Sequence, residues 1–137
     1  MEIVSFEIAQ KLKEKGFKEK CFAYYASYDA TLFYNKSNFR GGIVDDCLYS
    51  YNSLRESVST SELIDAPTIS QVLKWLREEK KLFVQISLFQ YCYDYCILDT
   101  EMVYYDNEHK VLHQGPTGYS YNEAVLAAIE YVLDNLI

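Results

Sequence analysis

Two consecutive stretches of the sequence alternate with a period of two, and this alternation constrains the fold more than any other feature. In the first stretch, four aliphatic residues alternate with Phe83, Gln85, Ser87 and Phe89: they are Leu82, Val84, Ile86 and Leu88. In the second stretch, the alternating residues are Tyr91, Tyr93, Tyr95 and Ile97. A period of two is typical of a β-strand with one apolar face. Residues 82–89 and 91–98 therefore predict two antiparallel strands joined by a turn near Gln90.

The same sheet is predicted to continue beyond residue 98. Residues 102–105 and 110–113 flank the tetrapeptide Asp-Asn-Glu-His at 106–109, whose composition is typical of a turn. These segments predict a third strand that continues the antiparallel meander, and whether they form a fourth strand stays open. The sequence Gly-Pro-Thr-Gly at 115–118 ends the sheet.

A helix is predicted immediately before this meander, within residues 66–81. Thr68 and Gln71 have the spacing of a capping box, and Pro67 disfavours helix before them. One apolar stripe follows at helical spacing: Ile69, Val72, Leu73 and Leu76. Trp75, the only tryptophan, lies at the edge of this stripe. We expect Trp75 to be buried, because a tryptophan at such an edge usually bridges layers of one domain.

A second helix is predicted at the end of the sequence. Ser120 and Glu123 form another capping box. Apolar residues then cover about half of the helix circumference: Val125, Leu126, Ala128, Ile129, Val132, Leu133, Leu136 and Ile137. A helix with so wide an apolar surface is expected to lie across the sheet.

The N-terminal half carries weaker signals. Ser5 as an N-cap and Gly16 as a C-cap predict a short helix over residues 6–15. Aromatic segments at 21–26 and 31–34 predict a β-hairpin. Residues 36–65 are rich in Ser, Asn, Gly and Asp without a sustained period, so we expect an irregular, mobile loop with a short strand near 47–51.

Together these elements predict one α+β domain over residues 1–137. An antiparallel meander is covered by two helices, and a short N-terminal helix and a hairpin pack alongside it. A chain of 137 residues is long enough to bury such a core without metals or disulfides.

The charge of the chain disfavours nucleic acid as a partner. The net charge is −7, and one basic run carries acidic residues within it: Lys11, Lys13, Lys15, Lys18 and Lys20. A phosphate-binding surface needs clustered Lys and Arg. The order helix, three strands, helix in residues 68–137 is similar in topology to the double-stranded-RNA-binding domain. Its last helix is acidic, however, where that domain carries a basic cluster.

The sequence also predicts a compartment. It starts without a basic segment followed by an apolar run, and no stretch approaches the ~18 apolar residues of a membrane span. We therefore expect a cytoplasmic protein with no membrane contact, in which the four cysteines are reduced thiols. We expect no cofactor.

One motif has the spacing of a two-cysteine, two-histidine zinc finger, formed by Cys92, Cys96, His109 and His113. Thr100 and Asp106 stand where such fingers place large apolar residues. If residues 91–98 form a strand, the two cysteines lie about 13 Å apart, at a rise of ~3.3 Å per residue. That separation is too large for one tetrahedral zinc ion, so small half-buried thiols are the favoured interpretation.

No catalytic set emerges from the sequence. Cys47 follows two carboxylates, Asp45 and Asp46, which oppose formation of a thiolate. Two adjacent acids in a Gly- and Ser-rich segment are usually solvated and bind no cation. The segment Arg40-Gly41-Gly42 lacks the strand, lysine and helix of a phosphate-binding loop. We expect a protein that is not an enzyme.

The two predicted long helices carry a resemblance to a known family. The sequences Ala-Pro-Thr at 66–68, Trp-Leu-Arg-Glu-Glu-Lys at 75–80 and the ending from Tyr121 to Ile137 resemble a family of small uncharacterised proteins from gut anaerobic bacteria and their prophages. The opening helix, which ends in Lys15-Gly16-Phe17, is also similar. The resemblance is strong in the two helices and poor over residues 36–62. Because that family has no assigned activity, it implies a setting and a compact fold, and no site residues.

The 14 tyrosines and the acidity favour a non-enzymatic module that binds another protein in the bacterial cytoplasm, encoded by a phage or mobile element. Four residues are candidates for an interaction surface: Trp75, Tyr91, Tyr93 and Tyr95. Whether Trp75 belongs to the core, as we expect, or to the interface stays open. A zinc- or nucleic-acid-binding regulator is the first alternative, and a small hydrolase is the least favoured one. The identity of the protein partner and the presence of a homo-oligomer stay open.

Overall fold

The structure is a computed structural model that describes residues 2–39, 42–45, 48–52, 63–103, 109–115 and 120–137. The described residues form a mixed α+β fold, which confirms the predicted class. Its elements group into two compact units, residues 1–70 and 71–137. The prediction of a single domain is not tested by this grouping and stays a prediction.

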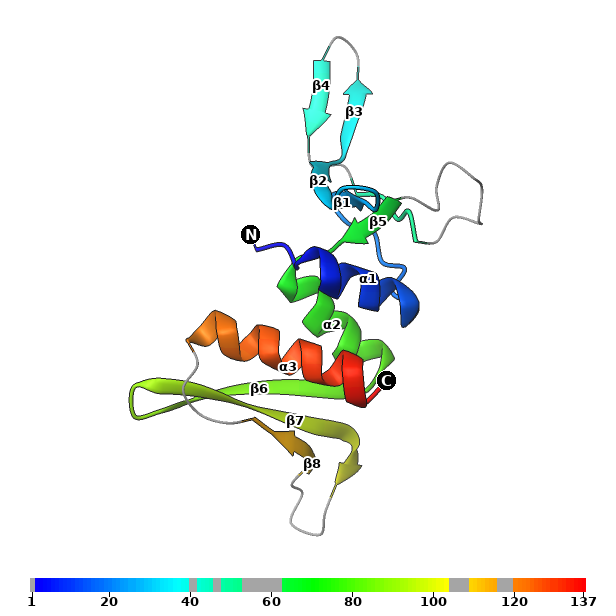
Figure 1. The fold of residues 1–137 in the computed structure, drawn as a ribbon. Helices are drawn as coiled ribbons and strands as arrows, with labels where there is room; N and C mark the ends of the chain where they lie inside the picture. The colour runs from blue at the N-terminus through cyan, green and yellow to red at the C-terminus, as the bar shows by residue number, and fades with distance from the viewer. Residues whose placement is uncertain (1, 40–41, 46–47, 53–62, 104–108, 116–119) are drawn as a thin grey trace. The chain divides into compact units, whose positions relative to one another are not determined.

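The first unit is built on an antiparallel sheet of three short strands in the order β2-β1-β5 (Figure 1). These are β1 (Ala23–Ala26), β2 (Thr31–Tyr34) and β5 (Leu63–Ala66). The β1–β2 hairpin lies where the sequence predicts it. Its turn is closed by a hydrogen bond from the Ala30 N–H to the Ala26 carbonyl, and Asp29 accepts from the Thr31 N–H.

Helix α1 (Phe6–Glu14) packs against β5 and confirms the predicted first helix. The Ser5 hydroxyl accepts from the Ile8 N–H as its N-cap, and the helix buries Ile8, Ala9 and Leu12. Gly16 follows it at a φ of +90°, which glycine adopts without strain. On the β1 side, the Tyr25 hydroxyl donates to the Val4 carbonyl at 2.7 Å.

The described parts of residues 36–65 contain regular strands that the sequence did not predict, whereas the predicted mobility of this region stays a prediction. Strands β3 (Lys36–Phe39) and β4 (Gly42–Asp45) pair as a hairpin, and β5 pairs with β1. The predicted short strand near 47–51 is represented by a single bridge between Cys21 and Tyr49. Four-residue strands are too short to show a period of two, and the partner of β5 lies some forty residues earlier, so local sequence does not show the pairing.

The second unit contains an antiparallel sheet in the order β6-β7-β8. Strand β6 (Leu82–Phe89) and strand β7 (Cys92–Val103) pair as predicted, with Gln90 in the turn at a φ of 56°. The predicted separate strand over 102–105 is wrong, because Met102 and Val103 belong to β7. Register shifts after Ile97 and Asp99 interrupt the alternation and conceal this continuity. Strand β8 (His109–Gln114) completes the sheet, and residues 104–108 lie outside the description.

Helix α3 (Tyr121–Asn135) lies along β6 and β7, as predicted (Figure 1). Ser120 accepts from the Glu123 N–H, and the Glu123 carboxylate accepts from the Ser120 N–H, which confirms the capping box. Its buried residues are Ala124, Val125, Ala128, Ile129, Val132 and Leu133.

Helix α2 (Ile69–Glu79) follows β5 and buries Val72, Trp75 and Leu76, whereas Leu73 is half-buried. Trp75 is 5% exposed, as expected, and the Lys80 ammonium lies 5.2 Å from its ring centroid. The predicted capping box at Thr68 and the packing of α2 on the sheet stay predictions. In the described part of the chain, no helix has the length and apolar character to cross a membrane.

We predict that Gly115→Ala destabilises the protein. Gly115 is buried after β8 and donates its N–H to the Tyr95 carbonyl. An added Cβ would overlap the ring of the buried Tyr95. The free energy of unfolding of the variant, measured in urea, should therefore fall by about 1–3 kcal/mol. Adding Tyr95→Leu should make the double variant lose less than the sum of the two single losses. Additive losses would contradict this steric account.

Candidate functional site

Four aromatic side chains form one continuous cluster in the first unit, which we call the aromatic face. Its members are Tyr24 of β1, Phe33 of β2, and Tyr49 and Tyr51 of the segment between β4 and β5. The Tyr24 ring stacks on Phe33 at 5.4 Å between centroids, and Tyr51 contacts both Tyr24 and Tyr49 at 4.8 Å. Phe33 is 40% exposed and Tyr49 is 44% exposed. The cluster is therefore ordered by its own ring contacts and still open to solvent.

Sheet register explains how β1, β2 and β5 build this surface. Tyr24 pairs with Phe33 on one side and with Asp65 on the other. Directly paired residues of an antiparallel sheet project from the same face. The row Phe33, Tyr24, Asp65 therefore lies on the face opposite to that of Tyr25, whose ring meets Phe6 of α1 edge-on.

Asp65 holds the segment that supplies the other two rings. Its side chain is fully buried, and its carboxylate accepts three hydrogen bonds from that segment. Oδ1 accepts from the Tyr51 N–H at 2.9 Å, and Oδ2 accepts from the Asn52 N–H at 2.9 Å and from the Ser50 hydroxyl at 3.1 Å. Hydrogen bonds to a charged acceptor are stronger than neutral ones, so this carboxylate fixes residues 50–52 over the sheet.

Further hydrogen bonds tie the same segment to the chain after α1. The Asn52 amide donates to the Phe17 carbonyl and accepts from the Asp65 N–H, and the Ser50 hydroxyl lies 2.9 Å from the Lys18 carbonyl. The backbones of Cys21 and Tyr49 exchange both hydrogen bonds of their bridge. Tyr49 and Tyr51 therefore stand on a backbone that is bonded on two sides.

Protonation in this region follows from burial. Burial raises the pKa of Asp65 above its ordinary value of 3.8, while the hydrogen bonds from Asn52, Tyr51 and Ser50 and the charge of Lys13 act in the opposite direction. Burial also raises the pKa of Tyr51. The Tyr51 hydroxyl is therefore neutral at physiological pH, where it is able both to donate and to accept.

Cys21 lies under this segment and is unsuited to act as a nucleophile. Burial raises its pKa far above the ordinary value, and the negative charges of Asp65 and Glu19 add to this. Its thiol contacts the Glu19 carbonyl at 3.4 Å. Next to it, the buried Asn35 amide donates to the Cys21 carbonyl, while its Oδ1 has no hydrogen-bond partner among the described residues. Cys47, the thiol considered from the sequence, lies outside the described residues.

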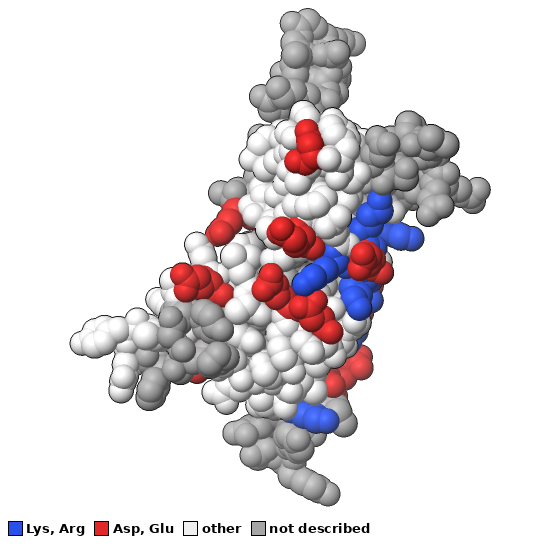
Figure 2. Space-filling view, in the orientation of Figure 1, with Lys and Arg blue, Asp and Glu red and all other residues white. Residues whose placement is uncertain are grey.

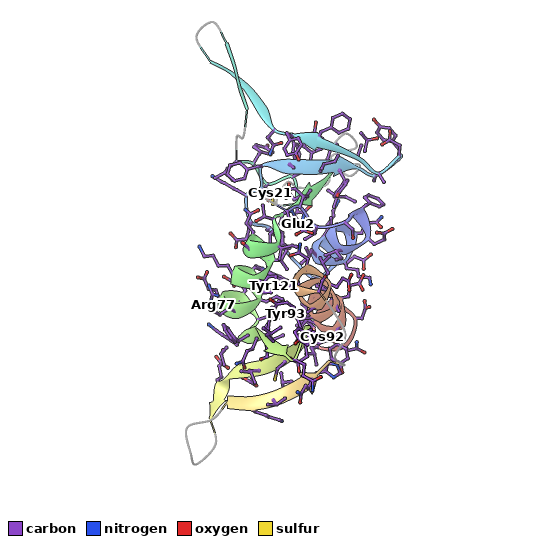
Figure 3. All side chains as sticks on the ribbon, turned by 90° about the vertical axis from the view of Figure 1, so that its left-hand side faces the viewer. Glu2, Cys21, Arg77, Cys92, Tyr93 and Tyr121 are labelled. Carbon is purple, nitrogen blue, oxygen red and sulfur yellow. The ribbon has the colours of Figure 1, made fainter. Side chains whose placement is uncertain are left out.

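The candidate contact residues from the sequence differ in exposure, and their role in binding stays a prediction. Trp75 is buried, which agrees with a core position, and Tyr95 is buried as well. Tyr93 is half-buried and meets the Tyr121 ring edge-on at 5.6 Å (Figure 3). Tyr91 alone stands free, at 99% exposure, beside the β6–β7 turn. The alternation that identifies this strand places Tyr93, Tyr95 and Ile97 on its apolar side, where packing explains them.

The Cys/His set, which the sequence analysis disfavours as a zinc site, is distributed along two paired strands. Cys92 and Cys96 both lie in β7, and His109 and His113 lie at opposite parts of β8. The His113 ring stacks on Tyr131 at 3.5 Å between centroids and lies beside Tyr95. Within the described residues, no three His, Cys, Asp or Glu side chains gather as a metal site requires. Cys21, Cys92 and Cys96 are free thiols.

Charge is mixed over the surface in view. On the face shown in Figure 2, Lys and Arg side chains are interspersed with Asp and Glu side chains. The elements of the second unit follow the order α2-β6-β7-β8-α3, as predicted. Helix α3 contains Glu123, Glu130 and Asp134 and no Lys or Arg. This charge disfavours contact with phosphates through α3.

Sequence reasoning missed the aromatic face. The aromatic segment at 21–34 signalled half of it, but Tyr49 and Tyr51 fall in a region that shows no period. Comparison of the sequence with protein-family models, with curated proteins and with solved structures found no match.

We predict that Asp65→Asn destabilises the protein, because an amide cannot accept at both of its atoms. In either orientation of the amide, one backbone N–H, that of Tyr51 or that of Asn52, would face an NH₂ group, and the free energy of unfolding should fall by about 2–4 kcal/mol. Asp29→Asn is the matched control, because the exposed Asp29 carboxylate also accepts a backbone hydrogen bond. It should change stability by about 0.5 kcal/mol or less. Equal losses in urea denaturation would contradict the role given to Asp65.

The pH dependence of this difference has a defined sign. Because the pKa of Asp65 is higher in the folded chain, the folded chain binds this proton more tightly than the unfolded chain. The contribution to stability is therefore full below the ordinary pKa of 3.8 and falls as pH rises through the folded pKa. The stability of the wild type minus that of Asp65→Asn should decrease over this window and then level. An increase with pH would overturn the assignment.

Proposed function

We propose that this protein is a non-enzymatic binding module that recognises another protein through the aromatic face. The observation that carries the proposal is the contact chain Phe33, Tyr24, Tyr51 and Tyr49, which is ordered and yet partly exposed. Tyrosine is enriched at protein interfaces, because its ring buries a large area while its hydroxyl stays hydrogen-bonded. A surface of this kind is suited to the centre of an interface.

The rigidity of the aromatic face supports the same proposal. Binding costs conformational entropy when side chains and loops become ordered at an interface. Here the backbone of Tyr51 and Asn52 is already held by Asp65, and the rings already contact one another. A partner would therefore meet a surface whose ordering cost is small.

The charge and the setting complete the proposal. The net charge of −7, with basic residues interspersed among acidic ones, favours a protein partner over a polyanion. We place the module in a bacterial cytoplasm, encoded by a phage or mobile element. Its bacterial and phage origin rests on the sequence resemblance alone. No cofactor enters the proposed function.

The test is affinity capture from the native host with the tagged full-length chain. The wild type should retain a protein in stoichiometric amount. Tyr49→Ala removes an exposed ring and should weaken binding of that protein about tenfold or more, as expected for a central interface tyrosine. Calorimetric titration with the purified partner measures the change, and urea denaturation checks that the variant is folded.

Tyr91→Ala is the matched control, because Tyr91 is the most exposed tyrosine among the described residues and lies outside the aromatic face. It should leave the affinity unchanged. Weakening by Tyr91→Ala with no effect of Tyr49→Ala would overturn the assignment of the surface. Absence of a stoichiometric protein would count against the proposed function itself.

A further inference from the structure

Strand β6 forms one edge of the sheet in the second unit. In the described part of the chain its single strand neighbour is β7. It is eight residues long, Leu-Phe-Val-Gln-Ile-Ser-Leu-Phe, with no charge and no proline. The Leu88 side chain on this edge is 63% exposed. Natural edge strands are usually protected by charges, proline, bulges or short length, and β6 has none of these.

The hydrogen-bond pattern defines which backbone groups of β6 face outward. The Lys81 carbonyl accepts from the Thr100 N–H, so this pair is of the hydrogen-bonded type. Such pairs alternate along an antiparallel ladder, and the odd-numbered residues of β6 therefore bond to β7. The N–H and C=O groups of Leu82, Val84, Ile86 and Leu88 point to the open edge.

We propose that two copies of this chain associate by antiparallel pairing of β6 with β6, with Gln85 opposite Gln85 of the second copy. Leu82 then pairs with Leu88 of the second copy, and Val84 pairs with Ile86 of the second copy. All four even-numbered residues hydrogen-bond across the new contact. The proposal is independent of the aromatic face.

This register is favoured over its neighbours by the length of β6. A shift of two residues toward the C-terminus would require Gln90, which has a positive φ and leaves the strand. A shift of two residues in the other direction would require Lys80, which precedes β6 and donates its N–H to the Leu76 carbonyl of α2. Only the register centred on Gln85 uses every outward backbone group of β6.

Side-chain chemistry identifies a second copy as the occupant. On the face that carries Val84, apolar residues pair with apolar residues. On the face that carries Gln85, the paired residues are uncharged. The strand is therefore complementary to itself. The exposed Leu88 would be covered by Leu82 of the second copy. Because the chain carries −7, a neutral edge is a place where two copies approach without strong repulsion. The opposite edge strand, β8, carries Lys110.

The test introduces a charge at the two-fold axis, where Gln85 faces Gln85 of the second copy. The wild type should dimerise reversibly with increasing concentration in sedimentation equilibrium. Gln85→Lys places two ammonium groups directly opposite each other at an exposed position, and should weaken the dimer about fivefold or more. Gln85→Glu should act likewise. An equimolar mixture of Gln85→Lys and Gln85→Glu should dimerise at least as tightly as the wild type.

Ser87→Lys and Ser87→Glu are the matched controls on the same exposed side of β6. In the proposed register the two Ser87 residues lie about 13 Å apart, beyond the screening length of about 8 Å at physiological salt. A mixture of these two variants should therefore dimerise no more tightly than either variant alone. A monomeric wild type at the highest soluble concentration, or a dimer that is insensitive to charge at Gln85, would overturn the proposal.

Discussion

A carboxylate that is fully buried in a sheet has to be compensated where it lies, and in the first unit this requirement organises the structure. Removing Asp65 from water is unfavourable unless donors replace the lost hydration. The donors come from Ser50, Tyr51 and Asn52, so the chain before β5 must return over the sheet to supply them. A segment without regular secondary structure is thereby given one conformation. The conformation of this segment determines where the rings of Tyr49 and Tyr51 lie.

The same tyrosine side chain serves different purposes in the two units. Tyr25 is buried and uses its hydroxyl to satisfy the Val4 carbonyl, whereas Tyr24 and Tyr51 contribute to an open surface. Tyr131 of α3 is occupied by stacking on His113. An excess of tyrosine in the composition therefore indicates interfaces only in part. Which tyrosines are available to a partner depends on the face of the strand and on what covers it.

How far the sequence predicts this protein depends on how local each signal is. Helix α3 and its capping box involve residues three and four apart, and β6 and the first part of β7 show their period without reference to any other segment, so these parts are predicted well. Strand β5 and the bridge at Tyr49 depend on partners far along the chain, and the donors to Asp65 lie 13 to 15 residues before it. From sequence alone, a carboxylate in a Ser- and Asn-rich region is predicted to be exposed to solvent. The sequence therefore does not predict the candidate site, although it does identify the aromatic segment that contains half of its rings.

The buried thiol of Cys21 has a consequence for how the first unit can be observed. A thiol reacts with alkylating reagents as the thiolate, and burial beside Asp65 suppresses that form in the closed structure. Labelling of Cys21 therefore requires an opening that brings water to the centre of the unit. Cys92 and Cys96, which are half-buried in β7, belong to the other unit. Cys21 is thus a natural reporter, because its labelling rate measures the opening of the first unit without the introduction of a probe, whereas the partly exposed Cys92 and Cys96 can be labelled without such an opening.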